Sequence, residues 1–435
     1  MKVAILAAGA AGMICGSCLR DNLLAGGLMA LGHDVTLVPL YTPLRTDLPA
    51  NTDQRVYFGG LNVYLDHVSP LYRRMPRWGR WLLDRPGMLR LAGRLGADKP
   101  PGELAALTRD VLLGAHGPMQ RETDRLLEFL GDLDPDIVTL PNLMFTGLAE
   151  QIHQRTGASV VCELTGEDIF LDAMPRAAGH EIQRLIHRHA RHVDAFVATS
   201  KYYAEKMSAY IGIDDMTIDT VYPGVPREFI HNAPLRRPEE RDHAIGYLAR
   251  ICREKGIDQL AEAFATVTAQ GQFRDVELRY AGYASPEGHR LVREIAARHQ
   301  RSNMRYLGEV DAVQKVALLD SVRLFCVPTA YAEAKGMFVL EALARGTPVL
   351  APAHGSFVEL ARETGAIALT APNDTRALAA SIVDLLSDFG KLRKLSAGAH
   401  EAIRAGFTVE HMAQGMLRVF ERARESRDQT QASRR

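Results

Sequence analysis

Apolar and amphipathic stretches alternate along the whole chain. Each apolar run is short, and an amphipathic stretch with a helical period of about 3.6 residues follows it. Runs that are apolar on both faces are typical of parallel strands buried between helices, so the alternation predicts doubly wound parallel sheets. The predicted strands cover residues 3–8, 34–38, 136–140, 159–164, 195–199 and 217–222, and then 243–248, 276–281, 304–308, 323–328, 347–351 and 366–369.

The strand pattern restarts after a charged segment, Arg236–Asp242, whose composition is typical of a linker. A chain of 435 residues is also long for one domain, so the predicted fold class is α/β with two Rossmann-like domains. The predicted boundaries are 1–228 for the first domain, with an irregular helical insertion at about 40–117, 229–242 for the linker, 243–405 for the second domain, 406–426 for a final helix and 427–435 for a tail.

Composition indicates the class of protein but not its function. Hydrophobic residues make up 47% of the chain and charged residues 24%, as in a soluble globular protein. Lys+Arg and Asp+Glu both number 52, so no net charge attracts nucleic acid, and no apolar run approaches the ~20 residues that span a bilayer. The five cysteines lie mostly in apolar strands, which favours free thiols and a cytoplasmic location.

The stretch Glu333-Ala-Lys-Gly-Met-Phe-Val-Leu-Glu341 combines a loop, a helix start and two carboxylates. The helix is expected to begin near Met337 or Phe338, after Gly336, and the first N–H groups of a helix attract phosphate. Carboxylates accept hydrogen bonds from hydroxyls instead. A ligand that carries both phosphates and hydroxyls is a nucleotide sugar. The alternative interpretation of this stretch is an ordinary amphipathic helix that carries two glutamates and binds no ligand.

Two other loops suit phosphate groups. Arg250 and Lys255 follow the predicted strand 243–248 and precede a helix, where two cations form a clamp for a diphosphate, although an ordinary charged loop would look similar. The first strand leads into a glycine-rich loop that includes Gly12. Its glycines do not fit the G-x-G-x-x-G pattern, which makes a nicotinamide cofactor a weak hypothesis.

These motifs resemble those of a known family. The two glutamates eight positions apart, followed by Glu341-Ala-Leu-Ala-Arg-Gly-Thr-Pro-Val, resemble the donor-site signature of the family-4 glycosyltransferases. The stretch Gly246-Tyr-Leu-Ala-Arg250 with Lys255-Gly256 resembles the diphosphate motif of the same family, with Ala249 where glycine is usual. Members of this family are retaining enzymes with the GT-B fold, in which the final helix crosses back to the first domain.

The resemblance implies a role for each matched residue. The first glutamate would hold hydroxyls of the transferred sugar, the second would hold the ribose, and the cations would neutralise the leaving diphosphate. The implied catalytic residues are Glu333, Arg250 and Lys255. The implied donor-binding residues are Gly12, Gly336, Met337, Phe338 and Glu341. The first domain would then bind the acceptor, and the second domain the nucleotide sugar.

The acceptor side matches the family less closely. Many members carry a cleft histidine where this chain has Thr165, so a histidine-assisted step is in doubt. Thr165, Glu167 and Asp168 are the candidate acceptor residues, because their loop follows a predicted strand and its acids suit an acceptor hydroxyl. Pro223 replaces the asparagine of the usual interdomain Asn-Gly-Val. The acceptor is expected to be a glycan, a glycolipid or a small metabolite.

The sequence therefore predicts a glycosyltransferase that moves a hexose-type sugar from a nucleotide-diphosphate donor, most readily a UDP- or GDP-sugar, with retention of configuration. No D-x-D pair lies at the predicted donor loops, so neither a metal nor a cofactor is expected. The alternatives are a non-catalytic nucleotide-sugar-binding GT-B protein and a nucleotide-sugar epimerase. A phosphorylase would need a cofactor lysine that the sequence does not reveal, and a thiol redox protein would use Cys15 and Cys18.

A basic segment interrupts the regular pattern at residues 71–99. It carries both tryptophans, Trp78 and Trp81, among several arginines. Such a segment suits an anionic membrane surface or an anionic acceptor, and one hypothesis is peripheral contact with the inner face of the membrane through 71–99. The alternative is a pair of surface helices that cover the first domain.

Overall fold

The computed structural model describes residues 1–9, 16–41, 101–214, 217–230, 236–300 and 303–434; side chains are not described at 101–104, 115 and 430–434. The chain folds into two compact units, Met1–Tyr222 with Met412–Arg435 (unit 1) and Pro223–His411 (unit 2). The candidate positions Gly12 and Cys15, and the basic segment 71–99, lie outside the described residues.

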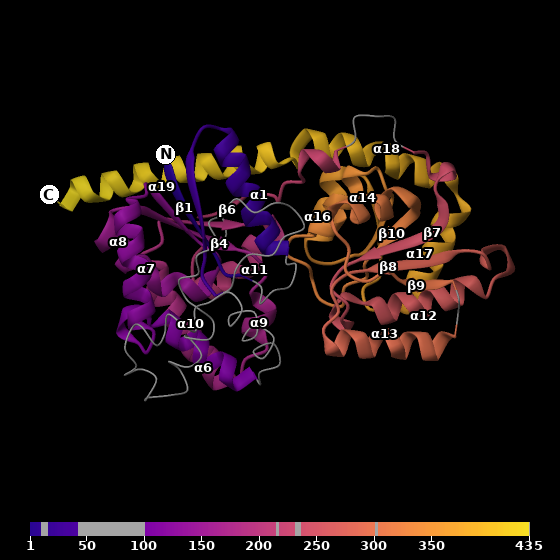
Figure 1. Ribbon diagram of the computed structural model, residues 1–435, viewed down its shortest axis with the longest axis horizontal. Coiled ribbons are helices and arrows are strands. Elements are labelled where there is room, and N and C mark those ends of the chain that lie inside the picture. The colour runs from indigo at the N-terminus through magenta and orange to yellow at the C-terminus, as the bar shows by residue number, and fades with distance from the viewer. Residues whose placement is uncertain (10–15, 42–100, 215–216, 231–235, 301–302, 435) are drawn as a thin grey trace. The chain divides into compact units, whose positions relative to one another are not determined.

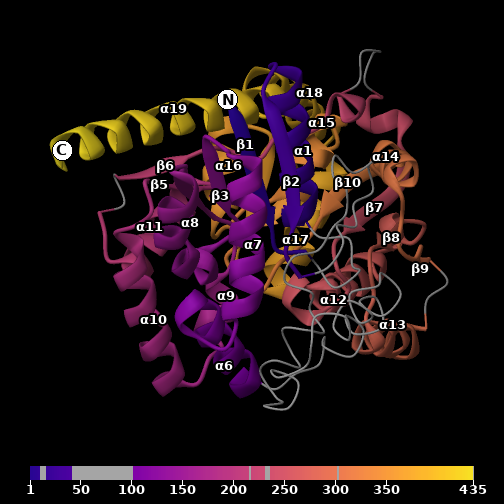
Figure 2. The same cartoon turned by 60° about the vertical axis from the view of Figure 1, so that its left-hand side comes forward.

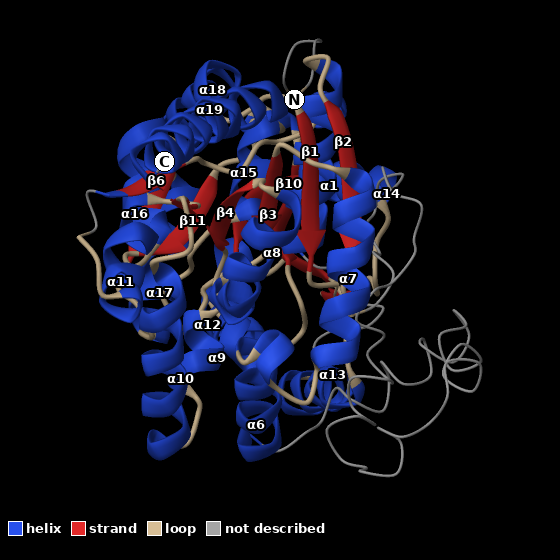
Figure 3. Ribbon diagram, turned by 90° about the vertical axis from the view of Figure 1, so that its left-hand side faces the viewer, coloured by secondary structure: helices blue, strands red, loops and turns tan. Residues whose placement is uncertain are grey.

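Unit 1 is built on a six-stranded parallel sheet with the order β2-β1-β3-β4-β5-β6. Strands β1 and β2 lie side by side in Figure 3, with Val3 opposite Val35. All described residues of β3 and β4 are buried, as expected for strands covered on both faces. The strands are β1 (Lys2–Ala7), β2 (Asp34–Pro39), β3 (Ile137–Leu140), β4 (Ser159–Leu164), β5 (Ala195–Ala198) and β6 (Ile218–Thr220).

Helices cover this sheet, and the last one brings the end of the chain back to it. Helix α10 contacts both α6 and α11 (Figure 2), and the hydroxyl of Ser159 in β4 donates to the Ala423 carbonyl of α19 at 3.4 Å. The helices are α1 (Gly16–Ala30), α6 (Pro101–Leu112), α7 (Gln120–Leu133), α8 (Ala149–Thr156), α9 (Asp168–Asp172), α10 (Arg176–Ala190), α11 (Lys201–Ile211) and α19 (Val409–Arg434).

Unit 2 repeats the architecture with the strand order β12-β11-β10-β7-β8-β9. Figure 1 labels β7, β8, β9 and β10 of this sheet. The chain starts in the middle at β7, adds β8 and β9 on one side, and then adds β10, β11 and β12 on the other. The border between β7 and β10 is thus a topological switch point, where ligands of doubly wound sheets bind. The strands are β7 (Asp242–Leu248), β8 (Glu277–Ala281), β9 (Met304–Tyr306), β10 (Val322–Cys326), β11 (Val349–Pro352) and β12 (Ile367–Thr370).

The helices of unit 2 pack against one another beside this sheet. Helix α12 contacts α13 and α17, and α18 contacts α15, α16 and α17. The helices are α12 (Ile257–Thr268), α13 (Pro286–His299), α14 (Ala312–Ser321), α15 (Met337–Ala344), α16 (Ser356–Thr364), α17 (Thr375–Ser387) and α18 (Phe389–Gly406).

The predicted fold class is confirmed: both units are parallel α/β sheets with helices around them. The hydrophobic pattern did not delimit α13 and α14, although each begins with a recognisable cap. The Ser285 hydroxyl caps α13 at Gly288, and Asp311 with Gln314 forms a capping box for α14. The segment expected to be a tail, 427–435, continues α19 as far as Arg434. No helix in the described part of the chain is long and apolar enough to cross a bilayer.

Candidate donor-binding site

Two loops meet at the switch point of unit 2, one after β7 and one after β10. Gly256 joins them closely, because a Cβ atom built on it would lie 1.8 Å from the Pro328 carbonyl oxygen. Its positive φ of 73° also suits glycine, which here caps the start of α12. The Ala330 amide donates to the Glu254 carbonyl at 2.9 Å. These contacts bring the predicted cation loop against the predicted carboxylate loop.

Lys255 and Glu333 form the central pair of this site. The Lys255 ammonium lies 2.6 Å from Glu333 Oε2, and the two side chains are 13% and 9% exposed. The ammonium also lies 4.9 Å from the centre of the Tyr331 ring and 5.0 Å from that of Phe338. Aromatic faces and a carboxylate thus surround the cation in a poorly hydrated position, where its charge acts strongly on a ligand.

The charge state of Glu333 follows from these contacts. Burial alone would raise its pKa, but the Lys255 charge and hydrogen bond outweigh burial, with a smaller contribution from Lys335. The pKa of Glu333 is lowered to about 2. Glu333 is therefore an ionised acceptor at neutral pH, the form that binds sugar hydroxyls.

Tyr331 and Arg250 complete the surroundings of this pair. The Tyr331 hydroxyl donates to Glu333 Oε2 at 3.2 Å. Burial and then the Glu333 charge raise the pKa of Tyr331, while the charge of Arg250 acts in the opposite direction. Arg250 follows the end of β7, and its charge acts on Tyr331, which in turn contacts Glu333.

The loop after β10 leads into helix α15, as predicted. Gly336 caps the helix with a φ of 67°, and Met337 and Phe338 supply its first two backbone N–H groups, which have no acceptor within a helix. The next loop supports this one, because the Ser356 amide donates to the Glu333 carbonyl at 2.8 Å. A Cβ atom on Gly355 would lie 2.6 Å from the Glu333 backbone, so the contact requires glycine.

Glu341 lies one turn further along α15 and is 3% exposed. The Lys315 ammonium of α14 lies 2.7 Å from Glu341 Oε1. Both predicted glutamates of the site thus face a lysine, one from the loop after β7 and one from α14.

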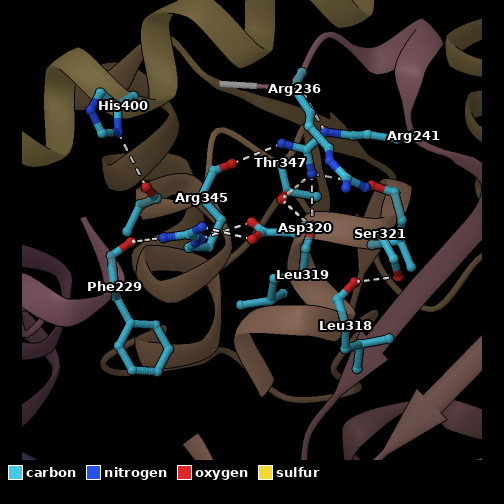
Figure 4. Close-up of polar contacts among 12 residues, drawn as sticks. Phe229, Arg236, Arg241, Leu318, Leu319, Asp320, Ser321, Arg345, Thr347 and His400 are labelled. Atoms are coloured by element: carbon cyan, nitrogen blue, oxygen red, sulfur yellow. Dashed lines mark hydrogen bonds and ion pairs between the residues drawn. The ribbon is translucent and has the colours of Figure 1, made fainter. Parts of the chain in front are cut away.

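The far end of α15 is fixed by a buried polar network (Figure 4). Arg345 contacts both carboxylate oxygens of Asp320 at 2.8 and 2.7 Å and donates to the Phe229 carbonyl at 3.0 Å. Arg241 donates to the Arg345 carbonyl and to the Thr347 hydroxyl at 2.8 and 2.9 Å. Burial lowers the pKa of Arg241 to about 10, with Asp320 opposing that shift and Arg345 adding to it.

The candidate acceptor loop lies in unit 1, after β4. Glu167 is saturated by its own surroundings: its Oε2 accepts from the amides of Thr165 and Gly166 at 2.8 and 2.9 Å and from the Tyr203 hydroxyl at 3.1 Å. Burial raises the pKa of Glu167 despite these hydrogen bonds. Asp168 accepts from the Tyr203 hydroxyl at 2.9 Å and from Lys206 at 2.6 Å. Thr165 is partly exposed, and its hydroxyl donates to the Pro141 carbonyl at 3.2 Å.

Two residues of the site, Tyr331 and Lys315, were missed from the sequence. A tyrosine two positions before Glu333 in a predicted loop gave a weak signal. Lys315 gave a stronger signal, because it is a cation that directly precedes the apolar run Val316-Ala-Leu-Leu. Of the two cysteines in the thiol-redox alternative, Cys18 is buried in α1. Within the described ranges no cluster of three metal-binding side chains occurs.

Solved structures share this architecture over nearly the whole chain. Sucrose-phosphate synthase from Thermosynechococcus elongatus aligns with a TM-score of 0.67 and 17% identity, covering 97% of this chain and 98% of the other. Anabaena HepE in complex with UDP and glucose aligns with a TM-score of 0.66 and 16% identity, covering 97% and 99%. At these identities the likeness establishes the fold alone.

Family comparisons cover both units. Residues 22–224 match the glycosyl transferase 4-like domain, and residues 230–402 match the glycosyl transferases group 1. The chain belongs to the GT-B glycosyltransferases. The group 1 match includes the Lys255, Glu333 and Glu341 positions of the site.

Curated relatives of this GT-B glycosyltransferase match it in part. The phosphatidyl-myo-inositol mannosyltransferase of Mycobacterium leprae is 32% identical over 168 residues, which is 38% of this chain and 43% of the relative. The D-inositol 3-phosphate glycosyltransferase of Nocardia farcinica is 28% identical over 244 residues, 53% of each protein. The chain thus spans about half the length of the curated relatives it matches.

Proposed function

We propose that this protein transfers a hexose-type sugar from a nucleotide-diphosphate donor to a hydroxyl acceptor, with retention of anomeric configuration and without a metal or cofactor. The observation that carries the proposal is the Lys255–Glu333 pair, 2.6 Å apart and directly before the N-terminus of α15. A cation, an ionised carboxylate and helix N–H groups in one place suit a diphosphate joined to a sugar.

In the proposed mechanism, Glu333 orients the sugar through its hydroxyls and Glu341 holds the ribose. Arg250, Lys255 and the amides of Met337 and Phe338 stabilise the charge that grows on the diphosphate as it leaves. Donors already in place at such a charge are usually the largest contribution to catalysis. The leaving diphosphate takes the proton of the acceptor hydroxyl on the same face of the sugar, so no separate protein base is needed.

The donor and acceptor classes are part of the proposal. The mycobacterial and nocardial relatives are named for inositol-bearing acceptors, and the Anabaena structure contains UDP and glucose. We therefore favour UDP- and GDP-hexoses as donors and polyols, glycans or glycolipids as acceptors. Thr165, Glu167 and Asp168 stay candidates for the acceptor side, with Thr165 the most accessible of the three.

The test is a transfer assay with UDP- and GDP-hexoses, using myo-inositol phosphate, phosphatidylinositol and oligosaccharides as acceptors. We expect release of nucleoside diphosphate that depends on the acceptor, a product whose anomeric configuration by proton NMR equals that of the donor, and undiminished rates in EDTA. Glu333→Ala should lower the rate on the order of 10²-fold or more. Full activity of that variant would contradict the role of Glu333, and donor turnover without any acceptor would favour an epimerase.

A further inference from the structure

The buried lysine–glutamate pair formed by Lys315 and Glu341 contains one residue that the proposed function leaves unexplained. The ammonium of Lys315 lies 2.7 Å from Glu341 Oε1, and the two side chains are 9% and 4% exposed. The same ammonium lies 5.4 Å from the centre of the Phe229 ring. Buried charges of this kind depend on one another, because either one alone would be costly in such surroundings.

The start of α14 determines the position of Lys315. Asp311 accepts from the Gln314 amide at 2.8 Å, and the Gln314 side chain accepts from the Asp311 amide at 3.1 Å, which completes a capping box. Lys315 follows immediately, so it stands in the first turn of the helix. The dipole of a helix disfavours a cation there, and the pairing with Glu341 offsets this effect.

A second ion pair joins the same two helices with the opposite polarity. Asp320 of α14 contacts Arg345 at the end of α15 at 2.7 Å (Figure 4). Helix α14 therefore supplies the cation in one pair and the anion in the other. The Asp320–Arg345 pair has no residue in the proposed donor site, whereas the Lys315–Glu341 pair includes the carboxylate assigned to the ribose. One pair thus serves as an internal control for the other.

We propose that Lys315 is a positioning residue that fixes the Glu341 carboxylate in orientation, and thereby makes the site select ribonucleoside over 2′-deoxyribonucleoside diphosphates. This inference rests on the proposed function, which assigns Glu341 to the ribose. A carboxylate held by a buried cation accepts hydrogen bonds from ribose hydroxyls without first reorganising. A ligand that lacks one hydroxyl leaves part of that buried acceptor unpaired, which lowers its affinity.

The test is titration calorimetry of the full-length protein with UDP, GDP, their 2′-deoxy counterparts and inorganic pyrophosphate. Lys315→Met should weaken binding of the ribonucleoside diphosphate roughly tenfold and bring the ribose-to-deoxyribose preference close to one. Pyrophosphate, which has no ribose, should bind as it does to the wild type. A role in folding alone would not separate these three classes of ligand.

Two further variants are needed in case Lys315→Met alone does not fold. They are Glu341→Gln and the double variant Lys315→Met/Glu341→Gln. The double variant has no unpaired charge at this position, so it should fold, and its affinity should equal that of Glu341→Gln. A further loss caused by Lys315→Met in the Glu341→Gln background would overturn the inference, because Lys315 would then act on its own.

Asp320→Asn is the matched control on the same helix pair. It should lower the melting temperature and leave the ribose preference unchanged. Wild-type ribose preference in Lys315→Met would overturn the inference while the proposed function stands, provided that Glu341→Gln still weakens binding. A wild-type protein that binds neither UDP nor GDP would overturn both.

Discussion

Glu333 in unit 2 and Glu167 in unit 1 are both 6% exposed, and both lie in loops that follow parallel strands. Their partners differ. Glu333 faces the ammonium of Lys255, whereas the Oε2 atom of Glu167 accepts from two backbone amides and a tyrosine hydroxyl. The pKa of Glu333 is lowered to about 2. Burial raises the pKa of Glu167 instead.

The comparison shows that burial does not decide the role of a carboxylate. A full charge beside Glu333 outweighs the cost of desolvation, and neutral donors around Glu167 do not. A lysine side chain can also turn toward an incoming phosphate, whereas backbone amides stay where the loop holds them. We therefore expect Glu333 to act on a ligand and Glu167 mainly to hold the loop that carries Thr165.

The largest expected effect comes from Lys255→Met. Transfer should fall on the order of 10²-fold or more, because the leaving diphosphate loses a cation. The variant also leaves Glu333 buried without its partner, which costs about 3–5 kcal/mol of stability. The assay is sugar transfer, with thermal unfolding measured on the same samples.

Two variants separate chemistry from folding in that experiment. Lys255→Met/Glu333→Gln should regain stability without regaining transfer, and recovery of transfer would contradict the role of Lys255. Lys391→Met removes an exposed lysine that lies 2.6 Å from Asp384 in the same unit, and it should change neither property.

The pH dependence of stability should differ in sign between the two glutamates. Glu333 has a pKa lowered from 4.5 to about 2, so its contribution of roughly 3 kcal/mol is present above pH 4.5 and is lost as the pH falls toward 2. Glu167 has a raised pKa, so its contribution is present below pH 4.5 and is lost as the pH rises through the raised value.

Denaturant unfolding between pH 3 and 8 checks this sign. The stability difference between wild type and Glu333→Gln should shrink with falling pH, and that between wild type and Glu167→Gln should shrink with rising pH. If the stability difference changed with pH in the same direction for Glu333→Gln and Glu167→Gln, the predicted opposite pKa shifts of the two glutamates would be contradicted.

Glu167→Gln should affect stability and spare the donor site. An amide nitrogen in place of one carboxylate oxygen faces N–H donors, so the free energy of unfolding should fall by about 1–3 kcal/mol. Affinity for nucleoside diphosphates, measured by calorimetry, should stay at the wild-type value. A loss of donor affinity in this variant would mean that Glu167 contributes to donor binding.

The smallest expected effect is that of Tyr331→Phe. It removes the 3.2 Å hydrogen bond to Glu333 and keeps the aromatic ring beside Lys255, so the donor KM should rise by no more than about tenfold. Tyr306→Phe is the matched control, because it loses a hydrogen bond to the Gly282 carbonyl in the same unit. Equal effects of the two variants on the KM would show that Tyr331 has no particular role.

The features that sequence could predict are those encoded within a few residues. Gly336 between two glutamates predicted the turn into α15, and the cations before Gly256 predicted the loop after β7. The two six-stranded sheets followed from short apolar runs alone.

Partners that come from distant parts of the chain could not be predicted in the same way. Lys315 meets Glu341 across 26 positions, and Lys255 meets Glu333 across 78, so their pairing depends on how helices and strands pack. The lowered pKa of Glu333 has the same origin, because Lys255 lies far from it in the sequence. Nothing in the local sequence of either glutamate shows whether a lysine or a backbone amide will face it.

The donor site in unit 2 can be tested by thermal unfolding of wild type, Glu341→Ala and Glu167→Gln with UDP, GDP, ADP and their sugars. A nucleotide at about 100 times its Kd should stabilise a folded site by roughly 2.7 kcal/mol. We expect one nucleotide to stabilise wild type and Glu167→Gln but to have little effect on Glu341→Ala. Equal stabilisation of all three proteins, or none by any nucleotide, would contradict the assignment of the donor site to unit 2.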